Sequence, residues 1–284
     1  MAAAKTPPSW ITSGAERVSG DLVLLHVHGL QISNMSKEVK TNTQAVRVGT
    51  AGWGFSSAHA ELFPVQGTQL ERYAQVFSAV EINSSFYRLH QAKTYARWHD
   101  SVPASFRFSV KIPKTISHQK RLIDSVDLLR EFIAGVTHLQ EKLGCLLLQL
   151  PPSLAFDAVI ADAFFKSLRR QTSVGLVCEP RHPTWFTPQA QELLERHLVS
   201  LVYAHPAPRP GLQLFESGPV TYARLHGAPI IYRSLYDEDF IDSLSQELTQ
   251  LYPKALEQWI IFDNTASGAA ITNALQMKVL LNHR

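Results

Sequence analysis

The sequence predicts a single (β/α)₈ TIM-like barrel over residues 46–284, with an N-terminal extension over residues 1–45. After the extension, apolar runs alternate with amphipathic stretches, and eight such repeats over roughly 235 residues are enough for one barrel. Seven of the apolar runs end in polar, ionisable or glycine residues. Because a barrel carries its functional groups at the C-terminal ends of its strands, this pattern also predicts where a site lies.

Eight apolar runs rich in Val, Ile, Leu and Phe are expected to form the strands. They are apolar on both faces, which is typical of parallel strands covered by helices. The strands are expected at about 46–49, 79–83, 106–112, 145–150, 175–180, 200–204, 220–225 and 259–263. The sixth run, Ser200-Leu-Val-Tyr-Ala-His205, fits the pattern least well.

Seven amphipathic stretches between the runs are expected to form helices. Leu129, Phe132 and Val136 recur at helical spacing in one of them. Asp157 and Thr187 are candidate N-caps, because their side-chain oxygens can accept from the first free backbone N–H groups. The helices are expected at 68–77, 92–100, 124–142, 157–171, 187–197, 237–251 and 268–281.

An open, doubly wound sheet is the alternative architecture. Such a sheet would be expected to carry a phosphate-binding glycine fingerprint after its first strand. Gly49, Gly52 and Gly54 have the wrong spacing for that fingerprint, and no P-loop is present in the sequence. The barrel is therefore the preferred interpretation.

The extension has one apolar patch, residues 22–27, which is short and is not followed by a small-residue cleavage site. It is therefore not interpreted as a secretory signal. Met35 opens a stretch that is typical of a natural translation start, so residues 1–34 are expected to be dispensable for the barrel.

The composition favours some classes of partner over others. Cys145 and Cys178 both lie in apolar runs, which indicates free buried thiols and a reducing, cytoplasmic location. The net charge is +3 and no dense Lys/Arg run occurs, so nucleic acid is a disfavoured partner. No apolar stretch approaches the ~20 residues of a membrane span. A small anionic or phosphorylated ligand is the expected partner, and the oligomeric state is not indicated.

Side-chain parity selects the groups that face the barrel mouth, because residues two apart on a strand share a face. At three strand ends two polar residues have this spacing, and two further strands contribute one each. The inward set comprises Glu81, Asn83, Lys111, Gln149, Glu179, Arg181, Arg224 and His226.

The same strand ends carry motifs that resemble the YecE-like family, known as domain of unknown function 72. The motifs, in the family's order, are Gly49-Thr-Ala-Gly-Trp53, Val80-Glu-Ile-Asn-Ser-Ser-Phe-Tyr87, Arg107-Phe-Ser-Val-Lys-Ile-Pro113, Thr115-Ile-Ser-His118, Leu148-Gln-Leu-Pro-Pro-Ser153, Glu179-Pro-Arg-His-Pro-Thr-Trp185, Tyr222-Ala-Arg-Leu-His-Gly227 and Phe262-Asp-Asn-Thr265. The resemblance covers residues 46–281. It implies a TIM barrel and brings no established reaction.

Two strand ends depart from the family pattern. The family typically has an acidic residue after the sixth strand, where this chain reads Ala204-His-Pro-Ala-Pro-Arg209. The last strand commonly ends in Asn-Asn-Thr and here ends in Asp263-Asn-Thr265. Asp263 is therefore a candidate to replace part of the missing charge.

The inward groups predict a metal-independent enzyme that uses acid–base chemistry on a small polar or anionic substrate. The expected catalytic residues are Glu81 or Glu179 as the general base and His226 as the acid or proton shuttle. Planar guanidinium groups suit a phosphate or carboxylate, and aromatic rings suit a ring-shaped substrate. The expected substrate-binding residues are Trp53, Asn83, Tyr87, Lys111, Gln149, Arg181, His182, Trp185, Arg224 and Asn264.

Two other functions stay open at this point. In a metal-dependent phosphoesterase or nuclease-like barrel, His118, His182, His205 and His226 would join Glu179 as ligands. No cofactor or metal is predicted, because nearby Lys and Arg residues would repel a cation. A non-catalytic anion-binding barrel is the other alternative. Its charged groups would pair with one another, as Glu81–Lys111 or Glu179–Arg224, to close the top of the barrel.

Overall fold

A computed structural model describes residues 45–284 except 210, 212–213, 252–256 and 283–284. The expectations for the N-terminal extension and for residues 1–34 fall outside this part of the chain, apart from residue 45. The described residues form a (β/α)₈ TIM-like barrel of parallel strands, as predicted. No helix among them is long and apolar enough to cross a membrane.

All pairings between the strands are parallel, and the eight predicted runs form the barrel to within a few residues. The strands pair in two sets, β1-β9-β8-β7 and β2-β3-β4-β5-β6. Their bounds are β1 (Ala45–Thr50), β2 (Ala79–Ile82), β3 (Arg107–Lys111), β4 (Leu143–Gln149), β5 (Gly175–Glu179), β6 (Val199–Leu201), β7 (Tyr203–His205), β8 (Val220–Leu225) and β9 (Glu257–Phe262).

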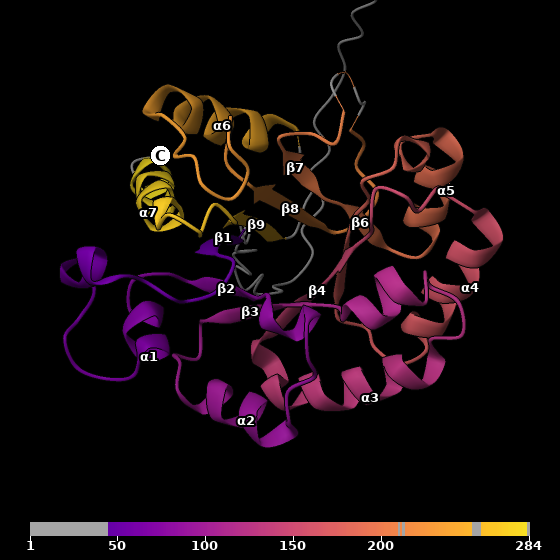
Figure 1. Ribbon diagram of the computed structural model, residues 1–284, viewed down its shortest axis with the longest axis horizontal. Coiled ribbons are helices and arrows are strands. Elements are labelled where there is room, and N and C mark those ends of the chain that lie inside the picture. Colours follow the sequence, from indigo (N-terminus) through magenta and orange to yellow (C-terminus); the bar gives the residue numbers. More distant parts are fainter. Residues whose placement is uncertain (1–44, 210, 212–213, 252–256, 283–284) are drawn as a thin grey trace, which may run out of the picture. The chain divides into compact units, whose positions relative to one another are not determined.

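The helices lie outside the strands and follow one another round them (Figure 1). Asp157 accepts from Val159 N at 2.9 Å, and Thr187 accepts from Ala190 N at 3.4 Å, so both predicted N-caps are confirmed. The helices are α1 (Gln69–Ala74), α2 (Ala92–Asp100), α3 (Val126–Val136), α4 (Ala158–Arg169), α5 (Pro188–Arg196), α6 (Glu238–Leu251) and α7 (Ala269–Asn282). They match the seven predicted stretches.

The sixth predicted strand is divided into β6 and β7, which are separated only by Val202. Its first half pairs with β5 and its second half with β8. The hydroxyl of Ser217 accepts from Leu201 N at 2.9 Å and donates to Val199 O at 2.7 Å, so it takes the place of a neighbouring strand. This division explains why the sixth run fits the strand pattern poorly.

The two sets of strands also meet between β1 and β2. Gly52 N donates to Glu81 O at 2.9 Å at the C-terminal end of this seam. Lower down, the phenol of Tyr73 from α1 donates to Ala79 O at 3.1 Å. A Cβ atom at Gly49 would lie 2.0 Å from Ala79 O, so the close approach of β1 requires glycine there.

The interior of the barrel is filled by side chains rather than being an open pore. Tyr222 and Trp259 stack with their ring centroids 5.9 Å apart. Both predicted free thiols, Cys145 and Cys178, are confirmed as buried, and burial raises the pKa of each. The interior cluster consists of Ala51, Ala79, Cys145, Leu147, Val177, Val202, Tyr222, Trp259 and Ile261.

Candidate active site at the C-terminal end of the barrel

Four ionisable side chains continue the interior faces of their strands towards the C-terminal end. Each lies two positions beyond a residue of the interior cluster, and residues two apart share a face. Arg224, for example, follows Tyr222 on β8. The four residues are Glu81 of β2, Glu179 of β5, Arg224 of β8 and Asp263 directly after β9. We call them the charged cluster.

Arg224 lies at the centre of the charged cluster and is fully buried. Its Nε and Nη2 atoms donate to the two carboxylate oxygens of Glu81 at 2.9 and 2.8 Å. Nη1 donates to Glu179 Oε2 at 2.8 Å, and Nη2 lies 3.0 Å from Asp263 Oδ2. Burial works against this charge, but the three carboxylates raise the pKa of Arg224 well above its usual value. Arg224 therefore holds three strand ends together and is closed to a ligand.

Tyr222 supports the cluster from below. Its hydroxyl donates to Glu81 Oε2 at 2.9 Å and lies 2.8 Å from Ser109 Oγ. Burial and the charge of Glu81 raise the pKa of Tyr222 well above its usual value. The phenol thus remains a neutral donor to the carboxylate.

His226, two residues beyond Arg224, is buried between two carboxylates. Its Nδ1 lies 3.0 Å from Asp263 Oδ2, and its Nε2 lies 3.1 Å from Glu179 Oε1. Arg181 Nη2 lies 2.7 Å from the same Nε2 and also forms an ion pair with Glu179. A charged imidazolium donates to both carboxylates, whereas a neutral ring that donates from Nδ1 accepts from Arg181 at Nε2. Nε2 is therefore the atom at which a proton can be gained or lost.

The two carboxylates beside His226 are held in their ionised form. Burial alone would raise the pKa of Glu179, but Arg224, His226 and Arg181 together lower it well below its usual range. Burial likewise opposes ionisation of Asp263, and its contacts with Arg224 and His226 lower the pKa of that carboxyl. Both groups act as acceptors at neutral pH.

Lys111 reaches the barrel mouth from β3 and differs from Arg224 in its surroundings. It is 6% exposed, and its Nζ lies 4.2 Å from the centre of the Phe86 ring. Among the described residues, no hydrogen bond or ion pair is found for this ammonium group, and Nζ is not one of the fully buried polar atoms that lack a partner. Burial, helped by Arg224, lowers the pKa of Lys111 to about 8, although the three carboxylates of the cluster oppose that shift.

Two further inward side chains have polar atoms without a partner. Asn83 Oδ1 and Arg181 Nε are buried and make no hydrogen bond within the described part of the chain. A buried polar atom left unsatisfied costs about 1–3 kcal/mol, and at the barrel mouth a ligand could satisfy these two. Atoms of the same kind also occur on Tyr95, Gln171, Thr221 and Asn264. Gln149, half-buried at the end of β4, shares the inward face of Leu147.

Four of the predicted substrate-binding residues lie in other surroundings. Trp53 packs edge-on against Trp98, and Trp185 is buried, with its indole N–H donating to Leu154 O at 3.0 Å. His182 caps the short helix that begins at Pro183. These side chains secure loops and core, a role that their strand-end positions do not reveal. The fourth, Asn264, donates from Nδ2 to Asn273 Oδ1 at 3.0 Å and so ties β9 to α7.

Tyr87 lies in an exposed position at the rim. Its ring contacts Phe86 edge-on at 5.1 Å, and Lys114 Nζ lies 5.5 Å from the ring centre. It therefore borders the Lys111 side of the mouth through Phe86. Phe86 itself was not among the predicted site residues, because a phenylalanine after a strand has no polar signature.

Asp263 is the main addition to the predicted site. The sequence suggested it as an acid of the mouth that could replace a missing charge, and in the structure it contacts both Arg224 and His226. Parity with Ile261, an interior residue of β9, identifies it as inward-facing. On the sixth strand the corresponding inward position is Ala204, two beyond Val202, which carries no charge. Of the two suggested structural pairs, Glu179–Arg224 is present, whereas Glu81 pairs with Arg224 rather than with Lys111.

The histidines named for a metal site have other partners. His118 lies 2.9 Å from Ser117 Oγ, and His205 Nδ1 lies 3.0 Å from the Tyr236 hydroxyl. Within the residues that the structure describes, no group of three or more His, Cys, Asp or Glu side chains is arranged to hold a metal ion.

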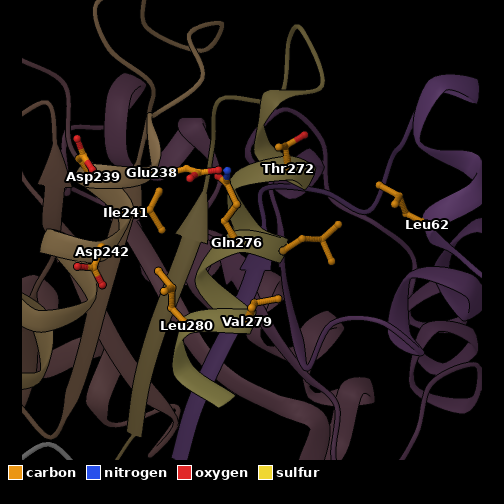
Figure 2. Close-up of a pocket in the computed structure, with 10 residues that line it drawn as sticks. Leu62, Glu238, Asp239, Ile241, Asp242, Thr272, Gln276, Val279 and Leu280 are labelled. Carbon is orange, nitrogen blue, oxygen red and sulfur yellow. The ribbon is translucent and has the colours of Figure 1, made fainter. Parts of the chain in front are cut away.

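A separate groove of about 710 Å³ lies between α6, α7 and Leu62. Figure 2 shows Ile241 and Asp242 of α6 to one side of the α7 side chains and Leu62 to the other. Glu238 and Asp239 belong to the first turn of α6, where carboxylates stabilise the helix N-terminus. None of the groove residues belongs to the charged cluster.

The chain is similar to proteins of one family along nearly all of its described length. The family model described as "Protein of unknown function DUF72" matches residues 47–284. The UPF0759 protein YecE of Escherichia coli (strain K12) is 36% identical over 126 residues, which are 44% of this chain and 46% of that protein. The match thus spans about half the length of that relative.

Two further comparisons extend over most of the chain. The UPF0759 protein YunF of Bacillus subtilis (strain 168) is 23% identical over 274 residues, covering 84% of this chain and 95% of that protein. The crystal structure of a DUF72 family protein from Enterococcus faecalis V583 has a TM-score of 0.72 at 23% identity, over 84% of this chain and 95% of that one. This likeness supports the barrel fold.

Proposed function

The chain belongs to the DUF72 family, and we propose that this member is a metal-independent enzyme that moves protons on a small anionic substrate. The proposed site is the C-terminal end of the barrel. His226 is the proton carrier, Glu179 is its partner base, and Arg181 binds the negative group of the substrate. Asp263 positions the imidazole, and Arg224 holds the carboxylates in place.

The observation that carries this proposal is the position of His226 between Asp263 and Glu179. A carboxylate at Nδ1 fixes the orientation of the ring and stabilises its positive charge when Nε2 takes a proton. The second carboxylate, 3.1 Å from Nε2, stays ionised and accepts a hydrogen bond from the protonated ring. Two acceptors thus hold the ring in place and stabilise its charge while Nε2 exchanges a proton with the substrate.

Arg181 supports the choice of an anionic substrate. Its side chain is 17% exposed, whereas those of Glu179 and His226 are 1% exposed, so the guanidinium covers the proton path on the open side. Nε of this arginine has no partner among the described residues. A carboxylate or phosphate that binds the guanidinium in a bidentate manner draws Nη2 away from His226 Nε2. Binding of the substrate and release of the proton carrier are then one event.

The charge of the site favours acid–base chemistry without a metal. The three carboxylates face three cations, Arg224, Arg181 and Lys111, so no excess negative charge is available to attract a metal ion. Arg224 already occupies the direction in which Glu81, Glu179 and Asp263 converge.

Exchange of substrate hydrogen in deuterium oxide tests the proposal. EDTA-treated protein is incubated with a panel of small carboxylic and phosphorylated acids, and loss of C–H signals is followed by proton NMR. We expect wild-type protein to exchange at least one panel member, and Glu179→Gln and His226→Gln to be slowed by about 10²–10⁴-fold. Glu192→Gln, on the exposed face of α5, is the matched control and keeps the wild-type rate.

Circular dichroism and thermal unfolding confirm that each variant is folded. Exchange that persists at the wild-type rate in folded Glu179→Gln and His226→Gln contradicts the assignment. Tight retention of an acid with no exchange and no turnover supports the non-catalytic anion-binding barrel instead.

A further inference from the structure

We propose that Lys111 is a covalent nucleophile, whose ε-amino group forms an imine with the carbonyl carbon of a small carbonyl acid such as a 2-oxo acid. This inference deepens the proposed function, on which it rests, by naming the substrate class. It assigns to Lys111 a bond-forming role in place of simple anion binding.

The environment of Lys111 favours an amine that is free to react. An ammonium group has three donors and ordinarily finds acceptors for them when it is buried. Lys142, the other buried lysine of the described residues, donates to His99 O at 2.6 Å and to Val102 O at 2.7 Å. Within the described part of the chain, Lys111 Nζ contacts the face of the Phe86 ring, which attracts a cation but offers no oxygen acceptor.

The protonation of Lys111 agrees with this geometry. Burial and the neighbouring Arg224 lower the pKa of Lys111 to about 8. About a tenth of the side chain is then the neutral amine at pH 7, against less than a thousandth for a lysine of ordinary pKa. Desolvation next to another cation is an established way to activate a lysine nucleophile.

The positions of Lys111 and Arg181 suit the two ends of a small carbonyl acid. Lys111 ends β3, and Arg181 follows the end of β5 on the inward face, with β4 between them. Neighbouring strands lie about 4.8 Å apart, so the two chains are roughly 10 Å apart at this level. Side chains that reach inward from both can meet a molecule of three to five carbons, with its acid group on Arg181 and its carbonyl carbon at Lys111 Nζ.

The chemical step balances without a redox partner. The amine lone pair attacks the carbonyl carbon, a C–N bond forms, and the carbonyl oxygen takes up a proton. The resulting carbinolamine loses that oxygen as water and leaves a protonated imine on Lys111. Starting from the ammonium form, one carbonyl compound enters and one water leaves, with no net proton uptake.

The imine would direct the proton chemistry at His226. A protonated imine withdraws electrons from the adjacent carbon, which makes a hydrogen on that carbon acidic. His226 Nε2, flanked by Glu179, is then the acceptor for this hydrogen. The proposed reactions are therefore those that make or break bonds at the carbon next to a carbonyl group.

Reductive trapping tests the inference. Full-length protein is incubated with pyruvate or glyoxylate and sodium cyanoborohydride, and the modified lysine is located by peptide mass spectrometry. We expect Lys111 to be labelled about 100-fold faster than the exposed Lys120 of the same segment, with half-maximal rate near pH 8. Acetone, which has no acid group for Arg181, is expected to label Lys111 at least tenfold more slowly than pyruvate.

Two variants complete the test. Lys111→Arg abolishes the fast labelling, and Lys120→Arg, the matched control, leaves it unchanged. The wild-type comparison between Lys111 and Lys120 stands even if Lys111→Arg folds poorly. Labelling spread evenly over exposed lysines with both probes, or absent from Lys111, overturns the inference.

The outcome is separable from that of the proposed function. Absence of trapping together with hydrogen exchange that depends on Glu179 removes the imine and leaves the acid–base proposal in place. Fast trapping at Lys111, together with hydrogen exchange whose rate is unchanged in Glu179→Gln and His226→Gln, supports the imine and removes the proton path.

Discussion

The β8 side and the β3 side of the barrel mouth each place one cation on an inward position, and the two cations differ in every other respect. Arg224 on β8 is fully buried and engages three carboxylates from β2, β5 and the end of β9. Lys111 on β3 retains slight exposure and has no hydrogen bond or ion pair within the described part of the chain. Inward positions at strand ends thus carry both a paired charge, Arg224, and a charge without an ion pair among the described residues, Lys111.

Charges at a barrel mouth therefore fall into two kinds, according to whether the protein supplies their partners. A buried charge whose partners are all supplied by the protein contributes to the architecture, and removing it leaves those partners uncompensated. A buried charge without a partner is costly to keep and indicates a ligand. Substitution is therefore expected to lower the stability of the fold much more at Arg224 than at Lys111.

The largest expected effect is on stability at Arg224. Arg224→Met removes the cation that three buried carboxylates share and leaves Glu81 without an ion pair, so we expect a loss of about 3–5 kcal/mol in the free energy of unfolding. Urea denaturation measures it. Lys111→Met is the matched control, and it should change the free energy by about 1 kcal/mol or less at pH 7, in either direction. Equal losses in the two variants would show that Lys111 is as structural as Arg224.

The pH dependence of stability should separate the two sides next. The pKa of Lys111 is about 8 in the folded chain and about 10.4 in an unfolded chain, so the unfolded state binds more protons between these values. Wild-type stability therefore rises with pH over this interval relative to Lys111→Met, by on the order of 3 kcal/mol. Urea denaturation at several pH values from 7 to 10.5 gives the difference. A constant difference over the whole range contradicts the lowered pKa.

On the β8 side, stability should also rise with pH, but over the acidic range. The pKa values of Glu179 and Asp263 are lowered in the folded chain, so their contribution is complete above the unfolded pKa of about 4. It is lost as the pH falls through the lower folded values. Acid unfolding of Glu179→Gln should lack the part of this dependence that Glu179 supplies. If the acid unfolding profiles of the wild type and Glu179→Gln superimpose after normalisation at pH 7, Glu179 is excluded as the source of the pH dependence.

The smallest effect is expected at Tyr222, below the cluster. Tyr222→Phe removes the hydroxyl that donates to Glu81, and we expect a loss of about 1–2 kcal/mol in the free energy of unfolding. Differential scanning calorimetry measures it. Tyr87→Phe, at the exposed rim, is the control and should have no measurable effect. A neutral Tyr222→Phe would mean that Arg224 alone satisfies Glu81.

Much of the site follows from local pattern. Parity at the ends of β2, β5 and β8 correctly gathers Glu81, Glu179, Arg224 and His226, because a strand repeats its faces every two residues. Trp185 could not be placed in this way. Trp185 also follows a strand end, but its indole N–H donates to Leu154 O in the core.

The alternation of strands and helices, the inward positions and the free thiols could all be predicted from the chain alone, because they depend on periodicity and composition along neighbouring residues. Which charge is satisfied could be seen only in the folded barrel. Arg224 meets Glu81 across 143 residues of chain, while Lys111, equally inward, meets none of the three carboxylates closely enough to pair. Pairing depends on distance and burial between separate strands, and both quantities exist only once the barrel has closed.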